Sequence, residues 1–387
     1  MLAAEVRSVD TTHPVTLAAA FPELSSHLGF LDALDVAGYN YKEHLYEESH
    51  RRFPGLPFLG SENGHSLEAW RAVTDNEYIS GQFLWTGIDY LGEAHGWPYR
   101  ASGAGLLTLA GFEKTGYYRR MSFWSREPMA HLATVRAAEA KQISEKEWRP
   151  YLETWNYMDG EPVEVVCYTN LDGAELFLNG ESLGVKEKSP DEDGIRWQVP
   201  YQAGTLSVRA FGASGAAGRQ FENGGKTADD VEQPETAGIS EQPETAGTSE
   251  QPEAAGTSEQ PEAAEAFDQL ETIGAPCQLK LQVYQLPEAL TAQTPDSKEI
   301  FQAEISVLDA KGRLAVTDAS RITVQISGGT LLGLESGDIA DCTEYSSPMR
   351  NAYHGRLLAF FRKNGEGQAT ITASAEALAP AGETVGC

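Results

Sequence analysis

The sequence predicts a multidomain protein that combines an α/β unit with two all-β sandwiches. Its 387 residues exceed what one hydrophobic core usually serves, so we expect two to four domains. Strand-length apolar runs alternate with helical spacings before residue 130, and short strands separated by turns dominate afterwards. A repetitive acidic segment divides the β-rich part in two. These features predict four regions, at 1–129, 130–218, 219–270 and 271–387.

In the first region, strand-like runs alternate with stretches whose apolar residues recur every three or four positions. The helical spacing is clearest at 22–34 and 66–78. Strand alternating with helix favours parallel βα units, and four such units are half of a (β/α)8 barrel. The strand-like runs are PVTLAAA (14–20), LDVAGYNY (34–41), PFLGSENG (57–64) and GQFLWTGIDY (81–90).

The second and fourth regions are each predicted to be an immunoglobulin-like β-sandwich, because short strands follow one another with turn residues between them. Asn179-Gly180 is the dipeptide that a type I′ hairpin prefers. The predicted strands lie at 163–170, 174–180, 194–200 and 204–212 in the first sandwich, and at 278–286, 300–314, 321–335 and 367–377 in the second.

The region 219–270 is predicted to be a disordered acidic linker. The nine-residue unit EQPETAGIS begins at Glu232 and recurs, with small changes, at Glu241, Glu250 and Glu259. Between Glu222 and Glu271 the sequence has fourteen acids and one base, a net of −13 out of −28 for the chain. A segment this polar cannot bury enough apolar surface to offset its ordering entropy. The remaining charge, also negative, argues against binding of nucleic acid.

The composition also argues against several classes of protein. Hydrophobic residues make up 41% of the chain, and no run approaches the ~18 apolar residues of a membrane helix, so no membrane insertion is expected. The N-terminal residues show no signal-peptide pattern, which favours the cytoplasm as an expectation. Four scattered cysteines form no CxxC pair and predict neither a disulfide framework nor a zinc site.

The ends of the strand-like runs carry polar and aromatic residues suited to a sugar site. Function gathers at the carboxyl ends of the strands in a (β/α)8 barrel. A carboxylate can attack or stabilise an oxocarbenium-like centre, and an aromatic face can pack on a sugar ring. A surface acid or a helix-cap neighbour would explain the same pattern. The candidates are Asn40, Tyr41, Glu62, His65, Trp85 and Asp89.

Five segments in order resemble the second half of the catalytic barrel of glycoside hydrolase family 2, and most closely its bacterial β-galactosidases. The downstream segment YTNLDGAELFLNGESLG (168–184) looks like the sandwich that follows this barrel. The segments GGTLLGLESGD (328–338) and RNAYHGRLLAFFR (350–362) resemble the family's C-terminal immunoglobulin-like module. The five barrel segments are SVDTTHPVTLA, LDVAGYNY, PFLGSENGHS, GQFLWTGIDYLGEAHGWP and GLLTLAGFEKTGYYRRMSFW.

The resemblance implies hydrolysis of terminal β-galactosides with retention of configuration, and a role for each candidate. Glu62 in GSENG would be the catalytic nucleophile, and Tyr41 would hydrogen-bond its carboxylate. Trp85 would be the aromatic platform, and His65 and Asn40 would contact the sugar. The family's uronate-binding Asn-x-Lys motif has no counterpart at Ser102-Gly103-Ala104-Gly105, which favours a neutral sugar.

The second carboxylate of the reaction is expected to be absent from this chain. In the family, the acid/base residue follows an asparagine at the end of the fourth barrel strand, and the resemblance starts after that point. The pair Asn76-Glu77 lies before the last predicted strand, at the wrong end of the barrel. Glu93 and Asp89 lie nearer the correct end, but the family pattern does not assign the acid role to them.

Three interpretations therefore stay open. The chain is a nucleophile-bearing part of such an enzyme, inactive alone, or one of two chains that a separate N-terminal half or self-association completes. Alternatively, it is a non-catalytic carbohydrate-binding or surface-display protein. The expected partner is a β-galactoside or related glycan. No cofactor is expected. Some relatives hold Mg²⁺ or Na⁺, but no ligand set can be assigned here.

Overall fold

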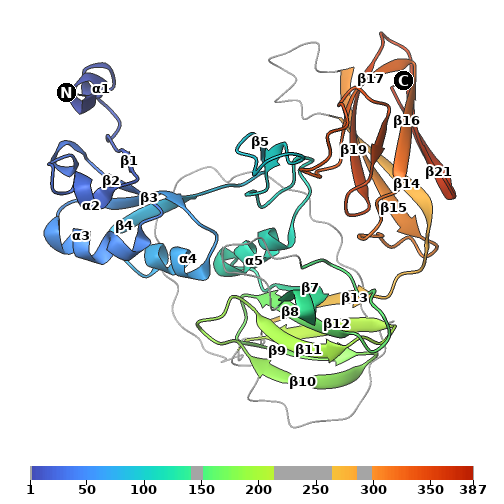
Figure 1. The fold of residues 1–387 in the computed structure, drawn as a ribbon, viewed down its shortest axis with the longest axis horizontal. Coiled ribbons are helices and arrows are strands. Elements are labelled where there is room, and N and C mark those ends of the chain that lie inside the picture. Colours follow the sequence, from blue (N-terminus) through green and yellow to red (C-terminus); the bar gives the residue numbers. More distant parts are fainter. Residues whose placement is uncertain (1, 141–150, 213–263, 286–298, 387) are drawn as a thin grey trace, which may run out of the picture.

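The computed structural model describes residues 2–140, 151–212, 264–285 and 299–386. The described chain is mostly β and forms three units (Figure 1): an α/β unit, a first β-sandwich and a second β-sandwich. The acidic repeat and its predicted disorder lie outside the described residues, except for the end of the predicted linker from residue 264. In the described part of the chain, no helix is long and apolar enough to cross a membrane.

The α/β unit is built on a sheet of four parallel strands in the order β1-β2-β3-β4. Parallel pairing agrees with the predicted alternation of strand and helix. Its core contains the fully buried rings of Tyr39 and Phe58, which meet edge to face at 5.4 Å. Its elements are α1 (Leu2–Val9), β1 (Ala18–Ala19), α2 (Pro22–Ser25), η1 (Leu31–Ala33), β2 (Ala37–Asn40), η2 (Glu43–Leu45), α3 (Tyr46–Arg52), β3 (Phe58–Asn63), α4 (Leu67–Thr74) and β4 (Ile79–Leu84).

Several predicted elements of this unit are shorter in the structure, among them the strand predicted at 14–20, of which only Ala18–Ala19 forms. The helix predicted at 22–34 is one turn, α2, because the Phe30 N–H closes a wide turn onto the Ser25 carbonyl (3.1 Å). The strand predicted at 81–90 ends at Leu84. Beyond it the chain leaves the sheet and forms the hairpin of β5 (Tyr90–Leu91) and β6 (Ala101–Ser102), and then α5 (Thr115–Trp124).

The first sandwich packs the sheet β10-β9-β12-β13 against the sheet β11-β8-β7. Its core includes Trp155, Val165, Leu176 and Leu206, all fully buried. Residues Asn179 and Gly180 both have positive φ (53° and 81°), as the predicted type I′ hairpin requires. The elements are β7 (Ala130–Arg136), α6 (Ala137–Ala140), β8 (Pro162–Thr169), β9 (Gly173–Leu178), β10 (Glu181–Glu187), β11 (Ile195–Pro200), β12 (Thr205–Phe211) and β13 (Glu265–Glu271).

Strand β13 corrects the predicted boundary between linker and second sandwich. It pairs with β12 along its whole length, so it belongs to the first sandwich. Ala266 is buried, Leu270 packs against the core, and the Asp268 carboxylate accepts a hydrogen bond from the Leu132 N–H (2.6 Å). The strand forms because these apolar residues and Asp268 complete the open edge of β12, which the acidic composition around them concealed.

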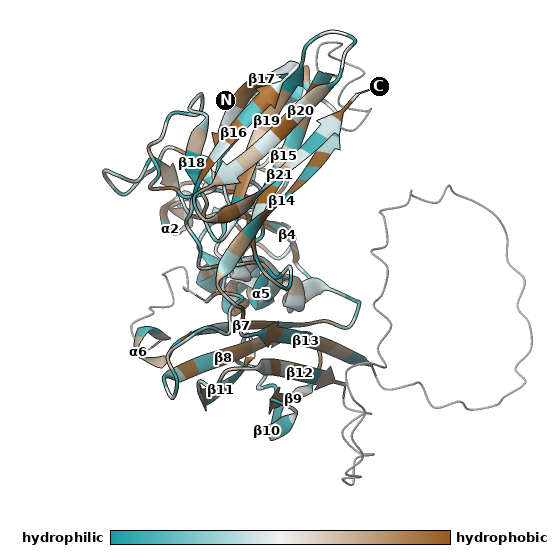
Figure 2. Ribbon diagram, turned by 90° about the vertical axis from the view of Figure 1, so that its right-hand side faces the viewer, coloured by the Kyte–Doolittle hydropathy of each residue, from teal (hydrophilic) through white to brown (hydrophobic). Residues whose placement is uncertain are grey.

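The second sandwich has eight described strands in the order β17-β19-β15-β14-β21-β20-β16-β18. Figure 2 shows apolar and polar residues alternating along its strands, as expected where one face of each sheet is buried. The run predicted at 321–335 is two strands, because Gly328 (φ +73°) turns the chain between them. The strands are β14 (Pro276–Gln285), β15 (Ile300–Asp309), β16 (Arg321–Ser327), β17 (Gly329–Glu335), β18 (Met349–Asn351), β19 (Arg356–Lys363), β20 (Ala369–Ala375) and β21 (Leu378–Val385).

Candidate active site

The carboxyl ends of β2 and β3 bring Tyr41 and Glu62 together. Asn40 is aligned with Glu62 across the parallel pair, and the Tyr41 N–H donates to the Glu62 carbonyl (2.8 Å). Tyr41 has a φ of +51°, an uncommon conformation for a non-glycine residue. The Tyr41 hydroxyl donates a hydrogen bond to the partly exposed Glu62 carboxylate. The structure thus forms the contact that the resemblance implied between these two residues.

The environment of Tyr41 keeps its hydroxyl protonated. Burial raises the pKa of Tyr41 strongly, and the hydrogen bond to Glu62 and its negative charge raise this pKa further. A neutral phenol can donate a hydrogen bond, whereas a phenolate could not. Tyr41 is therefore a permanent donor to the Glu62 carboxylate over the whole neutral and mildly alkaline range.

Trp85 follows β4 at the same edge of the sheet. Its N–H donates to the Asn63 carbonyl (3.0 Å), which fixes the backbone beside the end of β3. Its indole meets Tyr90 edge to face at 5.5 Å and is still 38% exposed. An exposed ring at this edge could pack on an apolar sugar face, and this role of Trp85 stays a prediction.

His65 supports the backbone of Trp85. Its Nε2 lies 2.8 Å from the Trp85 carbonyl oxygen and donates to it. Burial, followed by the positive charges of Arg120 and Arg119, lowers the pKa of His65 to about 4. The imidazole is therefore neutral near pH 7. The predicted contact between His65 and a sugar stays a prediction.

Asn40 is held in place from the neighbouring strand, because its Oδ1 accepts a hydrogen bond from the Ser61 hydroxyl (3.2 Å). Sequence reasoning missed two further polar residues. Asn63 is fully buried and donates from Nδ2 to the Glu43 carboxylate (2.8 Å). Asn63 directly follows Glu62 in GSENG, so its place in the motif was the available signal, whereas Glu43 lies in a helical turn that carries no recognisable pattern.

Asp89 stabilises the segment of the chain that follows Trp85. Its buried carboxylate pairs with Lys114 Nζ (2.6 Å) and accepts from the Gly105 N–H (2.8 Å). Burial raises the pKa of Asp89 and lowers the pKa of Lys114. Both contacts are made by Oδ1, so Asp89 stabilises this part of the chain through its contacts with Lys114 and Gly105.

Of the other acids considered from the sequence, Glu77 follows Asn76 at the far end of the sheet, and Glu93 contacts Tyr90. Asn76 accepts a hydrogen bond from Ile79 at the start of β4, which is the opposite edge of the sheet from Glu62. The Glu93 carboxylate accepts from the Tyr90 hydroxyl. Among the described residues, no group of three His, Cys, Asp or Glu side chains could hold a metal ion.

Glu62 does not coincide with either of two hollows in the described structure. These hollows, of about 490 and 530 Å³, lie elsewhere, one under the loop that follows β17 and one between α4, α5 and the first sandwich. Neither hollow is lined by Glu62, Tyr41 or Trp85. The candidate site is therefore recognised from the three neighbouring strand ends and not from a cavity.

The sandwiches match known domain families. Residues 160–217 match a domain of unknown function, DUF4982. Residues 288–384 match the domain family described as glycoside hydrolase family 2 C-terminal domain 5. Over 96% of its length, the chain is 26% identical to the β-galactosidase BoGH2A of Bacteroides ovatus. The chain is therefore similar to members of glycoside hydrolase family 2, and residues 288–384 match a domain of that family.

Solved structures of the family share the fold. A family 2 member from Bacteroides cellulosilyticus has a TM-score of 0.77 and 23% identity, and the match covers 99% of this chain and 45% of that one. A β-glucuronidase of the family has a TM-score of 0.63 and 16% identity, over 91% of this chain and 33% of that one. The chain spans 41% of the Bacteroides ovatus enzyme, less than half the length of the relatives it matches.

Proposed function

We propose that this chain carries the nucleophile-bearing part of a retaining β-galactoside hydrolase. The observation that carries the proposal is the hydrogen bond from Tyr41 to Glu62 at the carboxyl ends of adjacent parallel strands. The exposed indole of Trp85, which leaves the next strand, supports it. The three residues form a carboxylate, its donor and an aromatic platform.

In the proposed reaction, a Glu62 carboxylate oxygen attacks the anomeric carbon as the bond to the aglycone oxygen breaks. The aglycone leaves with a proton from a second carboxylic acid. Water then hydrolyses the glycosyl ester and returns its proton to that second group. Tyr41 orients the carboxylate through its donated hydrogen bond. Retaining enzymes hold the two carboxyl groups about 5–5.5 Å apart.

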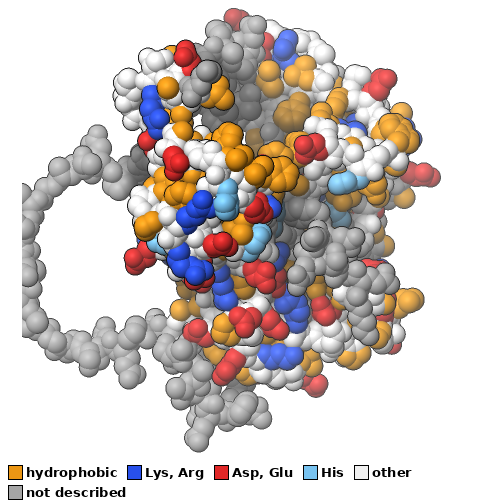
Figure 3. Space-filling model, turned by 60° about the vertical axis from the view of Figure 1, so that its left-hand side comes forward, with side chains coloured by type: hydrophobic (Ala, Val, Ile, Leu, Met, Phe, Trp, Pro, Cys, Tyr) orange, Lys and Arg blue, Asp and Glu red, His pale blue; other side chains and the backbone are white. Residues whose placement is uncertain are grey.

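The second carboxylate would come from four further βα units. We propose that β1 to β4 are half of a (β/α)8 barrel, because all four run parallel and both edge strands, β1 and β4, are open. Large apolar side chains are exposed around this unit, which comes forward in Figure 3, and they include Phe21 (72%) and Phe83 (64%). Further βα units, on a separate N-terminal half or a longer chain, would cover them.

The sugar is proposed to be neutral. The segment 102–105 has no lysine to pair with a uronate. The nearby cations are engaged elsewhere, Lys114 by Asp89 and Arg100 by Glu335. The name of the Bacteroides ovatus relative supports galactose as that neutral sugar.

The proposal is tested by trapping the glycosyl-enzyme with a dinitrophenyl 2-deoxy-2-fluoro-β-galactoside. Its leaving group departs without acid assistance, so the reaction needs only the nucleophile and the pocket. Intact-mass measurement should show one adduct that maps to Glu62, absent from Glu62→Gln and from a sample given the corresponding glucuronide. No adduct, from the chain alone or mixed with a polypeptide that supplies four further βα units, would overturn the proposal.

A further inference from the structure

The segment between Trp85 and β6 joins the candidate site to the second sandwich. Figure 1 shows the β5–β6 hairpin beside that sandwich and away from the sheet of the α/β unit. One side of the hairpin begins at Tyr90, whose ring contacts Trp85. The other side begins at Arg100, whose backbone N–H donates to the Ile339 carbonyl (2.9 Å).

Arg100 is inserted into the loop of the second sandwich that follows β17. Its guanidinium donates two hydrogen bonds to the Glu335 carboxylate (2.9 and 3.2 Å) and one to the Tyr345 hydroxyl (2.6 Å). Its Nε donates to the Asp341 carbonyl (2.5 Å). All donor nitrogens of the side chain are therefore engaged by one loop, and the side chains of Arg100 and Glu335 are only 17% and 7% exposed.

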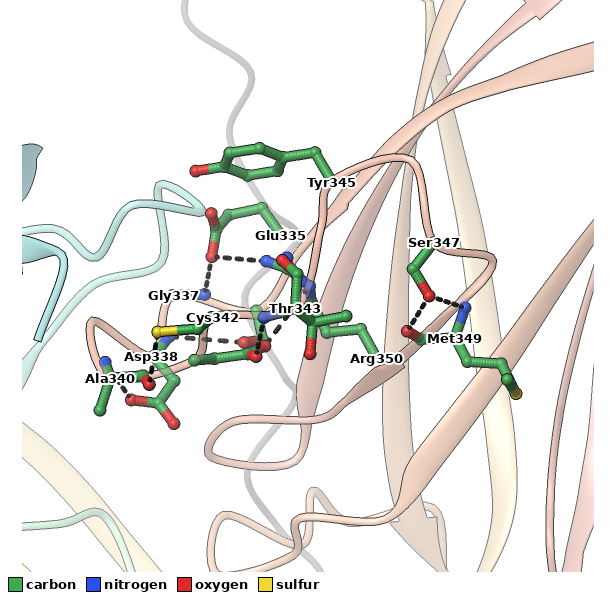
Figure 4. Close-up of polar contacts among 12 residues, drawn as sticks. Glu335, Gly337, Asp338, Ala340, Cys342, Thr343, Tyr345, Ser347, Met349 and Arg350 are labelled. Carbon is green, nitrogen blue, oxygen red and sulfur yellow. Dashed lines mark hydrogen bonds and ion pairs between the residues drawn. The ribbon is translucent and has the colours of Figure 1, made fainter. Parts of the chain in front are cut away.

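The receiving loop is built around a second guanidinium. Figure 4 shows Glu335 bonded to Arg350, with Tyr345 above them. Arg350 is fully buried and also pairs with Asp341 (3.4 Å). The Tyr345 ring lies 5.2 Å from the Arg100 guanidinium and 5.1 Å from that of Arg350. Glu335 thus pairs with two arginines, and it would be left beside Arg350 alone if Arg100 withdrew.

Short contacts within the β5–β6 hairpin connect Arg100 to the candidate site. The Arg100 carbonyl accepts from the Gly92 N–H (3.2 Å), and Tyr90 pairs with Ser102 across the hairpin. The Tyr90 ring meets the Trp85 indole, and its hydroxyl is close enough to raise the pKa of Tyr41. Movement of Arg100 would therefore displace the aromatic side of the site.

We propose that Arg100 is a positioning residue, through which the second sandwich fixes Tyr90 and Trp85 beside Glu62. This inference rests on the proposed function for its consequence in sugar binding. It assigns to the C-terminal sandwich a part in substrate placement, since Glu335, Tyr345 and Asp341 are the groups that hold Arg100.

The test compares Arg100→Lys and Glu335→Gln with the unmodified chain. Arg100→Lys removes the planar set of donors that reaches Glu335, Tyr345 and Asp341 together, and Glu335→Gln removes the charge that Arg100 pairs with, while both keep the size of the side chain close to the original. Labelling of Glu62 by the fluorogalactoside should lose about tenfold in efficiency. The loss should lie in the half-saturating probe concentration rather than in the maximal rate, because the platform binds the sugar and does not react. Hydrogen exchange of peptides from 86–102 should quicken, and that of 58–63 should not.

Arg313→Lys is the matched control. Arg313 also bridges two carboxylates, Asp309 and Glu271, but at the junction of the two sandwiches. It should leave labelling and exchange in 86–102 unchanged. If labelling occurs in the unmodified chain and Arg100→Lys changes neither its half-saturating concentration nor exchange in 86–102, the inference is wrong. If the unmodified chain is never labelled, the proposed function fails, and unchanged exchange in 86–102 would overturn the anchor independently.

Discussion

At the scale of single residues, the site depends on one hydroxyl and the carboxylate it holds. Tyr39 lies on β2 and Tyr41 directly follows its end, and the directions of the two side chains decide their roles. The Tyr39 ring is fully buried, and its hydroxyl donates to Ser49 (2.9 Å). Tyr41 lies just beyond the strand, where its hydroxyl reaches Glu62. Residue type and strand end could be predicted from the sequence, whereas the left-handed backbone at Tyr41 that aims this side chain could not.

Tyr41→Phe is expected to slow labelling of Glu62 about 10- to 100-fold. A hydrogen bond to a charged group is worth about 1.5–3 kcal/mol, and its loss leaves the carboxylate less stabilised and less well aimed. Because the pKa of Tyr41 is raised, the donor persists as the pH rises, and the unmodified chain should show no loss of labelling from Tyr41 ionisation up to pH 10. Tyr39→Phe is the control, since its hydroxyl serves Ser49. Equal labelling rates for the two variants would refute the role of Tyr41.

At the scale of elements, local patterns predicted strands well and their partners poorly. The β-rich runs at 163–170 and 204–212 correspond to β8 and β12. Strand β13 was assigned to the linker because its neighbours are acidic and its partner β12 lies more than fifty residues earlier in the chain. Strand β21 was missed because Pro380 and Gly382 weaken its pattern. Pairing between strands so far apart in the sequence depends on which strand edge of the folded sheet is unpaired. A short stretch of sequence does not contain that information.

Gly180→Ala should destabilise the first sandwich by about 1–2 kcal/mol. The residue has a φ of +81° in the turn between β9 and β10, and a Cβ there is strained even though no atom lies within 4 Å of it. Urea unfolding followed by hydrogen exchange of peptides from 162–211 should show a lower midpoint. Gly212→Ala is the control, because a Cβ there would make only ordinary contacts, the nearest at 3.7 Å. A midpoint for Gly180→Ala no lower than that of the control would contradict the turn assignment.

At the scale of the whole molecule, the three units are joined by buried polar contacts rather than by apolar area alone. Between the α/β unit and the first sandwich, the His131 ring stacks on Tyr118 at 3.6 Å and its Nε2 lies 3.1 Å from Glu153. The Arg100 pairing joins the α/β unit to the second sandwich. Such joints combine residues from distant segments, so the sequence indicated the units but not their arrangement.

The joint between the two sandwiches gives the last prediction. Asp309, at the end of β15, is 1% exposed and accepts from the Arg313 guanidinium (2.6 and 3.0 Å) and from the Gly274 N–H in the connecting segment (2.9 Å). The hydrogen bonds from Arg313 hold the pKa of Asp309 well below its ordinary value, and those from backbone N–H groups add to this against the opposing effect of burial. The pKa of Asp309 is lower in the folded protein than in the unfolded protein, where it is about 3.9. The ionised carboxylate therefore stabilises the fold fully at pH values above about 3.9, and this stabilisation is lost as the pH falls from there toward the folded pKa.

Asp309→Asn should therefore lower the melting temperature by about 5 °C at pH 7, and the difference should shrink at pH 3. Calorimetry at both pH values measures it. Asp318→Asn is the control, since the Asp318 carboxylate accepts two hydrogen bonds from Ser320 within the same turn. A difference between Asp309→Asn and the unmodified chain that stays equal at the two pH values would show that the charge of Asp309 does not hold the sandwiches together. A difference that shrinks would mean that the charge of Asp309 stabilises the joint between the two sandwiches and that acid weakens this joint.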